Sequence, residues 1–83
     1  MIFMTGYTAI GNVDMRNLGR ELRQRVKARK GDFLWVATVP NGYEVRDPTG
    51  VVATLTEQGF KLSSNSYNGL HSDLERAYVH YKR

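Results

Sequence analysis

The stretch FLWVATVPNGYEVRDPTGVVATLT, residues 33–56, contains three runs of β-forming residues separated by two turn sequences. Pro40-Asn41-Gly42 is strong turn chemistry, and Asp47-Pro48-Thr49-Gly50 has Pro and Gly where a type I turn favours them. Connections this short join antiparallel neighbours. We therefore predict an antiparallel meander of three strands, to which Phe60-Lys61-Leu62 adds a short fourth.

The first of these runs, Phe33 to Val39, is apolar almost throughout. A strand without polar alternation is typical of a sheet interior, where both faces are covered. We expect this run to be a central strand, with Trp35 in the core. The run at Tyr43–Arg46 alternates instead, which predicts one wet face.

A helix is predicted before the meander, from Asp14 to Lys30. Asp14 can cap the first turn, and Gly31 suits the left-handed position after the last. The expected buried stripe, at spacings of three and four, is Met15, Leu18, Leu22 and Val26.

A second helix is predicted after the meander, starting at Ser72. Ser72 and Glu75 fit a capping box, in which each side chain satisfies a backbone donor of the other. The expected buried stripe of this helix is Leu74, Ala77, Tyr78 and Tyr81.

These elements predict an α+β fold in the order helix, three- to four-stranded antiparallel β-meander, helix. Both helices would lie on one face of the sheet, since that arrangement buries both stripes and the apolar sheet face together. Residues 1–83 are expected to form a single domain, with residues 1–12 as an N-terminal arm or a short strand.

The composition gives little support to catalysis. The chain has no cysteine, two histidines and scattered single carboxylates, so neither a zinc site nor a hydrolytic triad is indicated. No glycine-rich phosphate loop is present. We expect a non-enzyme without cofactor or metal. The absence of cysteine, of a signal peptide and of a long apolar run favours a cytoplasmic protein that does not bind membranes.

Positive charge is concentrated in the first predicted helix. Residues 13–30 hold seven Lys or Arg against two acids, whereas the whole chain has a net charge of +4. On a helical wheel, five of the cations align along about 20 Å of helix beside the apolar stripe. These five, named here the basic seam, are Arg16, Arg20, Arg23, Lys27 and Lys30.

The basic seam indicates an anionic partner. Like charges at this spacing repel by a few tenths of a kcal/mol per pair, and phosphates or an acidic protein surface would offset that repulsion. The alternative is a solvated face kept for solubility. In a nucleic-acid complex, Tyr43, Trp35 and above all Tyr67, in the polar loop 63–69, could offer stacking faces. Tyr67 could equally cap that loop.

The element order over residues 14–82 resembles that of double-stranded-RNA-binding domains and of HicA-type toxins, and the hairpin at 43–52 resembles the toxin's second and third strands. The toxin's catalytic histidine precedes its second strand, where this chain has Pro40-Asn41-Gly42. The RNA-binding domains place lysines at the start of the last helix, where this chain has residues 69–73, GLHSD. The resemblance therefore implies an element order and neither activity.

Three functions remain open from the sequence. The first is a binding module that engages nucleic acid, or a nucleic-acid-handling complex, through the basic seam. The second is an inhibitor that binds a host protein, analogous in size and style to phage-encoded proteins such as anti-CRISPRs. The third is a structural or oligomeric subunit that pairs through a sheet edge at Tyr43–Arg46. A monomer or weak homodimer is expected.

Overall fold

A computed structural model describes residues 7–9, 13–64 and 66–80. The elements follow in the order β1 (Tyr7–Ala9), α1 (Met15–Ala28), the short 3₁₀ turn η1 (Lys30–Asp32), β2 (Trp35–Val39), β3 (Gly42–Asp47), β4 (Gly50–Thr56), β5 (Gly59–Leu62) and α2 (Leu70–His80). The predicted α+β order of helix, meander and helix is confirmed, with the meander having four strands.

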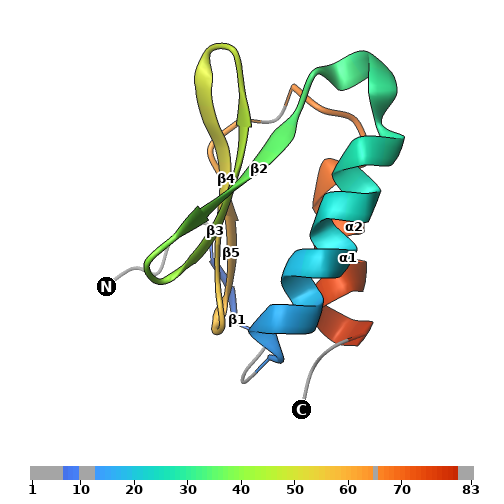
Figure 1. Cartoon of the computed structure of the whole chain (residues 1–83). Coiled ribbons are helices and arrows are strands. Elements are labelled where there is room, and N and C mark those ends of the chain that lie inside the picture. The colour runs from blue at the N-terminus through green and yellow to red at the C-terminus, as the bar shows by residue number, and fades with distance from the viewer. Residues whose placement is uncertain (1–6, 10–12, 65, 81–83) are drawn as a thin grey trace.

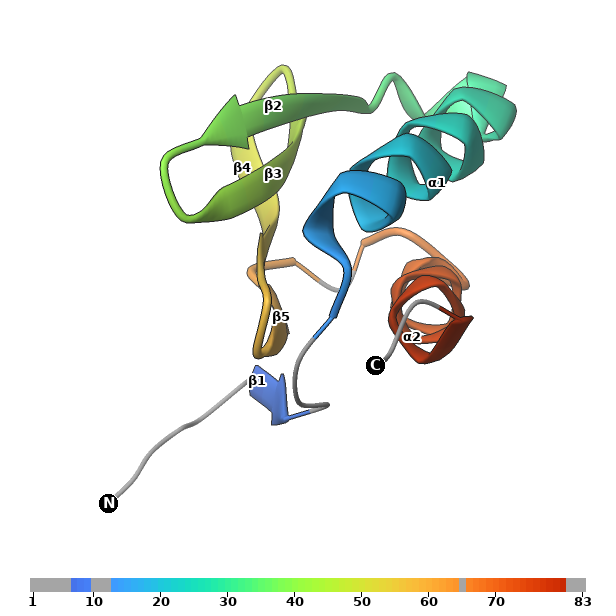
Figure 2. The ribbon, with the colours of Figure 1, turned by 60° about the horizontal axis from the view of Figure 1, so that its bottom comes forward.

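The sheet is antiparallel throughout, in the order β1-β5-β4-β3-β2. The four meander strands are neighbours in sequence and in space, and β1 adds to the sheet beside β5. Both helices lie on one side of the sheet, with α1 toward β2 and α2 toward β5 (Figures 1 and 2).

The position of β2 corrects the sequence prediction. The apolar run was expected in the centre, but among the described strands β2 lies at the edge of the sheet. The first strand of a meander becomes central only if another strand pairs with its free side. The N-terminal strand could have done so, but it pairs at the opposite end, Tyr7 with Lys61.

The turns form where the sequence places them. Directly after the β2–β3 turn, Gly42, the first residue of β3, has φ +153°. A Cβ atom there would lie 2.0 Å from the Leu55 carbonyl oxygen, so this position requires glycine. In the β3–β4 turn, the Asp47 carboxylate accepts hydrogen bonds from the backbone and hydroxyl of Thr49, at 2.8 and 2.6 Å.

The core lies between the sheet and the two helices. A register shift between Val45 and Arg46 lets the consecutive residues Val52 and Ala53 both be buried. Tyr78 anchors α2, because its buried hydroxyl reaches the carbonyl oxygens of Thr56 and Gly59. The buried apolar residues are Val13, Leu18, Leu22, Val26, Val45, Val52, Ala53, Leu55, Phe60, Leu70, Leu74, Ala77 and Tyr78.

The predicted helix stripes are largely confirmed. Leu18, Leu22 and Val26 are buried, and Met15 packs against them as a partly buried residue. Leu74, Ala77 and Tyr78 are buried on α2, whereas the predicted contribution of Tyr81 lies outside the described residues.

Two helix boundaries differ from the prediction. Helix α1 begins with Asp14 as its cap, as expected, but ends at Ala28, so Lys30 lies on η1. Phe33, not Gly31, takes the left-handed conformation, with φ 56°. Helix α2 begins at Leu70, two residues before the predicted capping box, because the fully buried Leu70 side chain starts the apolar stripe earlier.

Candidate nucleic-acid interface

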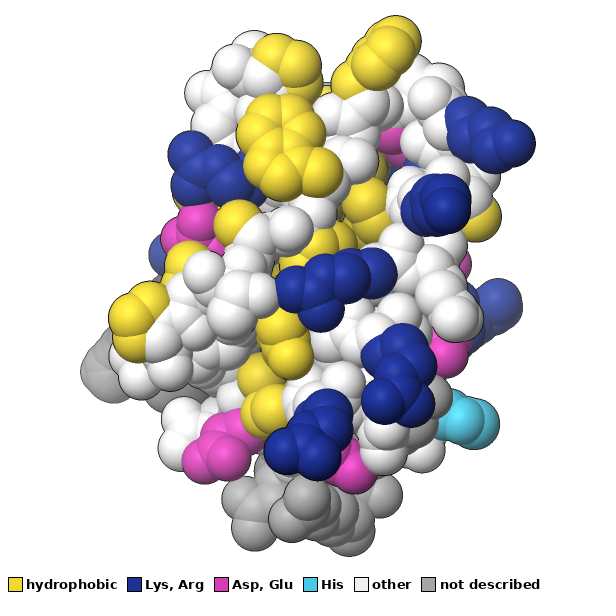
Figure 3. Space-filling view, viewed as in Figure 1, with side chains coloured by type: hydrophobic (Ala, Val, Ile, Leu, Met, Phe, Trp, Pro, Cys, Tyr) yellow, Lys and Arg dark blue, Asp and Glu magenta, His cyan; other side chains and the backbone are white. Residues whose placement is uncertain are grey.

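The basic seam forms along the outer side of α1. Its residues alternate with the buried stripe, and all five side chains are exposed. Figure 3 shows Lys and Arg side chains in a row over α1, beside a hydrophobic strip that fills the space between α1 and β2. Four of the five cations lie on α1, and Lys30 continues the row on η1.

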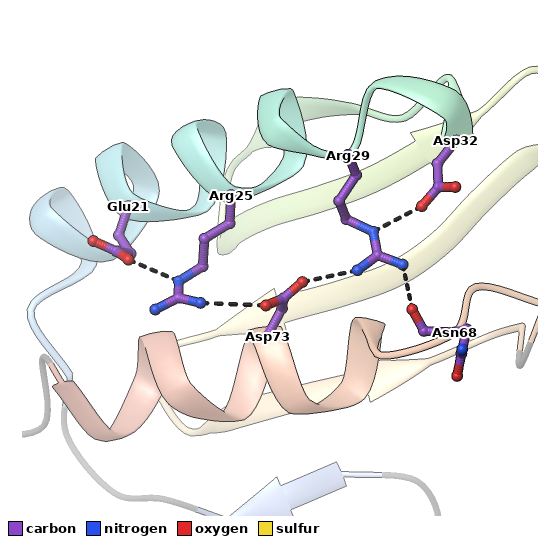
Figure 4. A network of polar contacts seen from close by, with 6 residues as sticks. All are labelled: Glu21, Arg25, Arg29, Asp32, Asn68 and Asp73. Carbon is purple, nitrogen blue, oxygen red and sulfur yellow. Dashed lines mark hydrogen bonds and ion pairs between the residues drawn. The ribbon is translucent and has the colours of Figure 1, made fainter.

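The other arginines of this segment are neutralised by the protein's own acids. Arg25 contacts Glu21 at 2.7 Å and Asp73 at 3.3 Å. Arg29 contacts Asp32 and Asp73, each at 2.8 Å, and donates to the Asn68 carbonyl oxygen at 2.6 Å. Figure 4 shows that these contacts join α1 to α2 and to the loop before it.

The seam cations have no such counterions. Within the described parts of the chain, no Asp or Glu lies within 4.0 Å of Arg16, Arg20, Arg23, Lys27 or Lys30 as an ion-pair partner. The segment therefore separates its charges: the flank toward α2 is internally paired, and the flank toward β2 faces solvent unpaired.

Arg23 connects the seam to the sheet. Its guanidinium donates a hydrogen bond to the Thr38 hydroxyl at 2.8 Å and lies 5.4 Å from the centroid of the Tyr43 ring. Tyr43 in turn donates to the Met15 carbonyl oxygen at 3.0 Å. Its hydroxyl approaches α1 at Gly19, where a Cβ atom would lie 2.2 Å away. These contacts hold one seam cation against β2 while leaving it exposed.

Two large exposed rings lie at the start of the edge strand next to the seam, one on β2 and one two residues before it. Trp35 is 47% exposed and Phe33 is 75% exposed. The prediction that Trp35 lies in the core is therefore wrong. Trp35 stands on the sheet face opposite the helices, since its neighbour Val36 packs against the core and side chains alternate along a strand.

A shallow groove joins the rings to the cations. It has a volume of about 250 Å³ and lies between α1 and the start of β2, lined by Arg23, Val26, Lys27, Leu34, Trp35 and Val36. Two seam cations and Trp35 thus border the same depression. The sequence pattern identified the seam and offered Trp35 as a candidate stacking face, but it predicted that this side chain lies in the core.

Tyr67 is held within the fold. Its half-buried hydroxyl donates a hydrogen bond to the Asp47 carboxylate. Hydrogen bonds from Thr49 and then from Tyr67 hold the pKa of Asp47 below its ordinary value, and the contact with Asp47 raises the pKa of Tyr67. This hydrogen bond joins the loop that contains Tyr67 to the end of β3. Its contact with a partner stays a prediction.

Other places where chemistry could occur offer few reactive groups. A hollow of about 640 Å³ lies between Met15, the β2–β3 turn and the β4–β5 turn, and Glu57 is the one charged residue among the described residues that line it. His71 packs edge-on against Phe60, with ring centroids 5.2 Å apart. The described residues contain no cluster of three or more metal-ligating side chains, and none of their helices is long and apolar enough to cross a membrane.

No protein-family model, curated protein or solved structure matches the chain significantly.

Proposed function

We propose that this protein is a non-catalytic module that binds nucleic acid through the basic seam. The observation that carries the proposal is the separation of charge on the α1 segment. Arg25 and Arg29 are paired with acids, whereas five neighbouring cations are exposed without a counterion among the described residues.

The repeat of the seam suits a polyanion. Its cations recur at intervals of three and four residues, which places neighbours about 5–6 Å apart along one side of the helix. A line of evenly spaced cations matches a line of phosphates better than it matches an isolated small anion. Contacts of this kind position the partner without reading its sequence, so binding is expected to tolerate many sequences.

Salt dependence follows from the same geometry. Each phosphate contact releases condensed counterions, so the logarithm of the association constant falls linearly with the logarithm of salt concentration. Five contacts would give a slope of about −4.5 for a duplex or about −3.5 for a single strand.

The test compares two double variants of equal charge. Arg20→Glu with Lys27→Glu reverses two seam cations, and Lys61→Glu with Arg76→Glu reverses two exposed cations outside the seam. Binding of a labelled oligonucleotide is followed by fluorescence anisotropy at several salt concentrations. The seam variant should weaken binding and reduce the salt slope by about 2. The control variant should change neither the affinity nor the salt slope by a comparable amount. Equal effects of both variants would show that net charge, not the seam, is responsible.

A protein partner is the second candidate function, and the open edge of β2 favours it. An edge strand that carries the exposed Trp35 and follows the exposed Phe33 can accept a strand from another protein, and the seam would then face acidic residues beside it. This is the protein-directed inhibitor considered from the sequence. Stoichiometric retention of a defined partner after nuclease digestion would favour it over nucleic acid, and loss of the partner on digestion would favour the first proposal.

A further inference from the structure

The exposed indole of Trp35 has no evident structural task. The side chain begins the edge strand, stands on the sheet face that no helix covers and remains 47% exposed. Phe33, two residues earlier, is 75% exposed. Two large aromatic rings left in solvent at one corner of a small domain are more typical of a contact surface than of a site without function.

The same corner carries the middle of the basic seam. Arg23 and Lys27 line the groove that Trp35 borders, and the Arg23 guanidinium is fixed there by Thr38 and the Tyr43 ring. A ligand that fills this groove therefore meets cations on its α1 side and borders Trp35 on its β2 side.

We infer that the protein binds single-stranded nucleic acid, with Trp35 stacking on an unpaired base while Arg23, Lys27 and the rest of the seam hold the phosphates. The inference rests on the proposed function and names its substrate class. Bases in a duplex are stacked on each other, so an indole beside a phosphate-binding row cannot reach their faces. Unpaired bases leave those faces open, and a cationic track with an adjacent aromatic ring is the usual combination in single-strand binders.

Charge argues for this occupant over a protein strand on β2. A strand paired with the edge of β2 would run past Arg23 and Lys27, and an apolar segment that matched Trp35 and Phe33 would leave these cations unpartnered. A nucleic-acid strand provides a partner for the cations and for the Trp35 ring, since each nucleotide carries one phosphate and one base that can stack.

The chain supplies its own probe, because Trp35 is its only tryptophan. Titration of the protein with a 20-nucleotide oligothymidylate, with single-stranded RNA of the same length, and with a DNA duplex of that length is followed by tryptophan fluorescence. Single strands should quench Trp35 and bind more tightly than the duplex at equal salt.

Variants separate stacking from charge. With a labelled single strand, Trp35→Ala should weaken binding roughly five- to a hundred-fold, Trp35→Phe should retain most of the affinity, and neither should change the salt slope. Val79→Ala, which removes exposed apolar surface on α2, is the matched control and should bind as the wild type. Circular dichroism verifies that each variant is folded.

The outcomes distinguish the two proposals. If the seam variant loses binding but Trp35→Ala does not, or if the duplex binds more tightly than the single strands, the inference is wrong and the proposed function stands. If the seam variant binds single and double strands as the wild type does, the proposed function itself fails.

Discussion

Gly19 shows how closely α1 and the sheet approach. The side chain of Tyr43 occupies the space where a Cβ atom would be, with its hydroxyl 2.2 Å and its Cζ 2.4 Å from that position. A glycine inside a helix costs about 1 kcal/mol relative to alanine. Here the cost is offset by the contact that Tyr43 makes with the Met15 carbonyl oxygen.

We predict that Gly19→Ala destabilises the protein, although alanine is the better helix former. Overpacking costs about 1–3 kcal/mol, which equals or exceeds the gain in helix propensity. Urea denaturation measures the change. Gly31→Ala is the control, because nothing lies within 4 Å of a Cβ atom there. Combining Gly19→Ala with Tyr43→Ser should destabilise less than the sum of the two changes, and simple additivity would contradict the steric account.

The lowered pKa of Asp47 predicts that the folded state loses stability in acid. Its pKa is lowered in the folded state, chiefly by the Thr49 hydroxyl and then by Tyr67. The folded state therefore binds this proton less tightly than the unfolded state does. The resulting stabilisation is complete above the ordinary aspartate pKa of about 4 and is lost as the pH falls through the lower, folded value.

We expect Asp47→Asn to show a smaller loss of stability between neutral pH and about pH 3 than the wild type. Thr49→Val should reduce the loss more than Tyr67→Phe, following the order of their effects on the pKa. Denaturant midpoints at several pH values provide the measurement. A pH profile unchanged by all three substitutions would show that Asp47 does not contribute to acid sensitivity.

Arg29 and Lys30 are adjacent cations, but only Arg29 takes part in the ion pairs that reach α2. The Arg29 side chain is 16% exposed and makes three contacts, with Asp32, Asp73 and Asn68. Lys30 is exposed and has no ion-pair partner among the described residues.

We predict that Arg29→Ala destabilises the protein by about 1–2 kcal/mol, because it leaves Asp73 and the Asn68 carbonyl with fewer donors. Lys30→Ala should change stability by less than about 0.5 kcal/mol. Arg29→Lys should restore little, since an ammonium group does not reproduce the planar fork of donors. Equal effects of the two alanine substitutions in chemical denaturation would contradict the structural role of the network.

The elements could be predicted better than their arrangement. Turn residues at 40–42 and 47–50 define the hairpins, and the helical spacing of Leu18, Leu22 and Val26 defines the face of α1 that is buried. Turn residues and helical spacing are local signals, so the sequence alone predicts the hairpins and the buried face of α1. The same helical periodicity predicts the alignment of the seam cations.

The place of β2 and the exposure of Trp35 could not be read in this way. Both depend on whether the N-terminal strand pairs beside β2 or beside β5, and no local pattern decides that. An apolar run such as FLWVATV is compatible with a central strand and with an edge strand. The side chains of a run do not show whether its backbone N–H and C=O groups pair on one side or on both. The pairing edge predicted at Tyr43–Arg46 is also wrong, because this run lies inside the sheet, between β2 and β4. A structural or oligomeric role as such stays a prediction.

The whole molecule combines an open strand edge with a row of cations. If two copies paired antiparallel through β2, a two-fold axis would place their α1 helices next to each other and their basic seams face to face. Charge beside an edge is a common protection against such pairing.

We therefore predict that the protein is monomeric at low salt and that neutralising the seam promotes self-association. Sedimentation velocity should detect concentration-dependent dimers for Arg20→Gln with Lys27→Gln, and not for Lys61→Gln with Arg76→Gln. Stable dimers of the wild type at low ionic strength would contradict this account.

The pairing of β1 with β5 has a consequence for how the chain folds. The strands from β2 to β5 each pair with the next one along, so their contacts are local and can form quickly. Tyr7 pairs with Lys61, about 50 positions later, and closing so large a loop costs entropy before any contact repays it. During synthesis, Tyr7–Ala9 leaves the ribosome long before its partner strand exists. Among the described strands, β1 is thus synthesised well before β5 and is one of the last to pair.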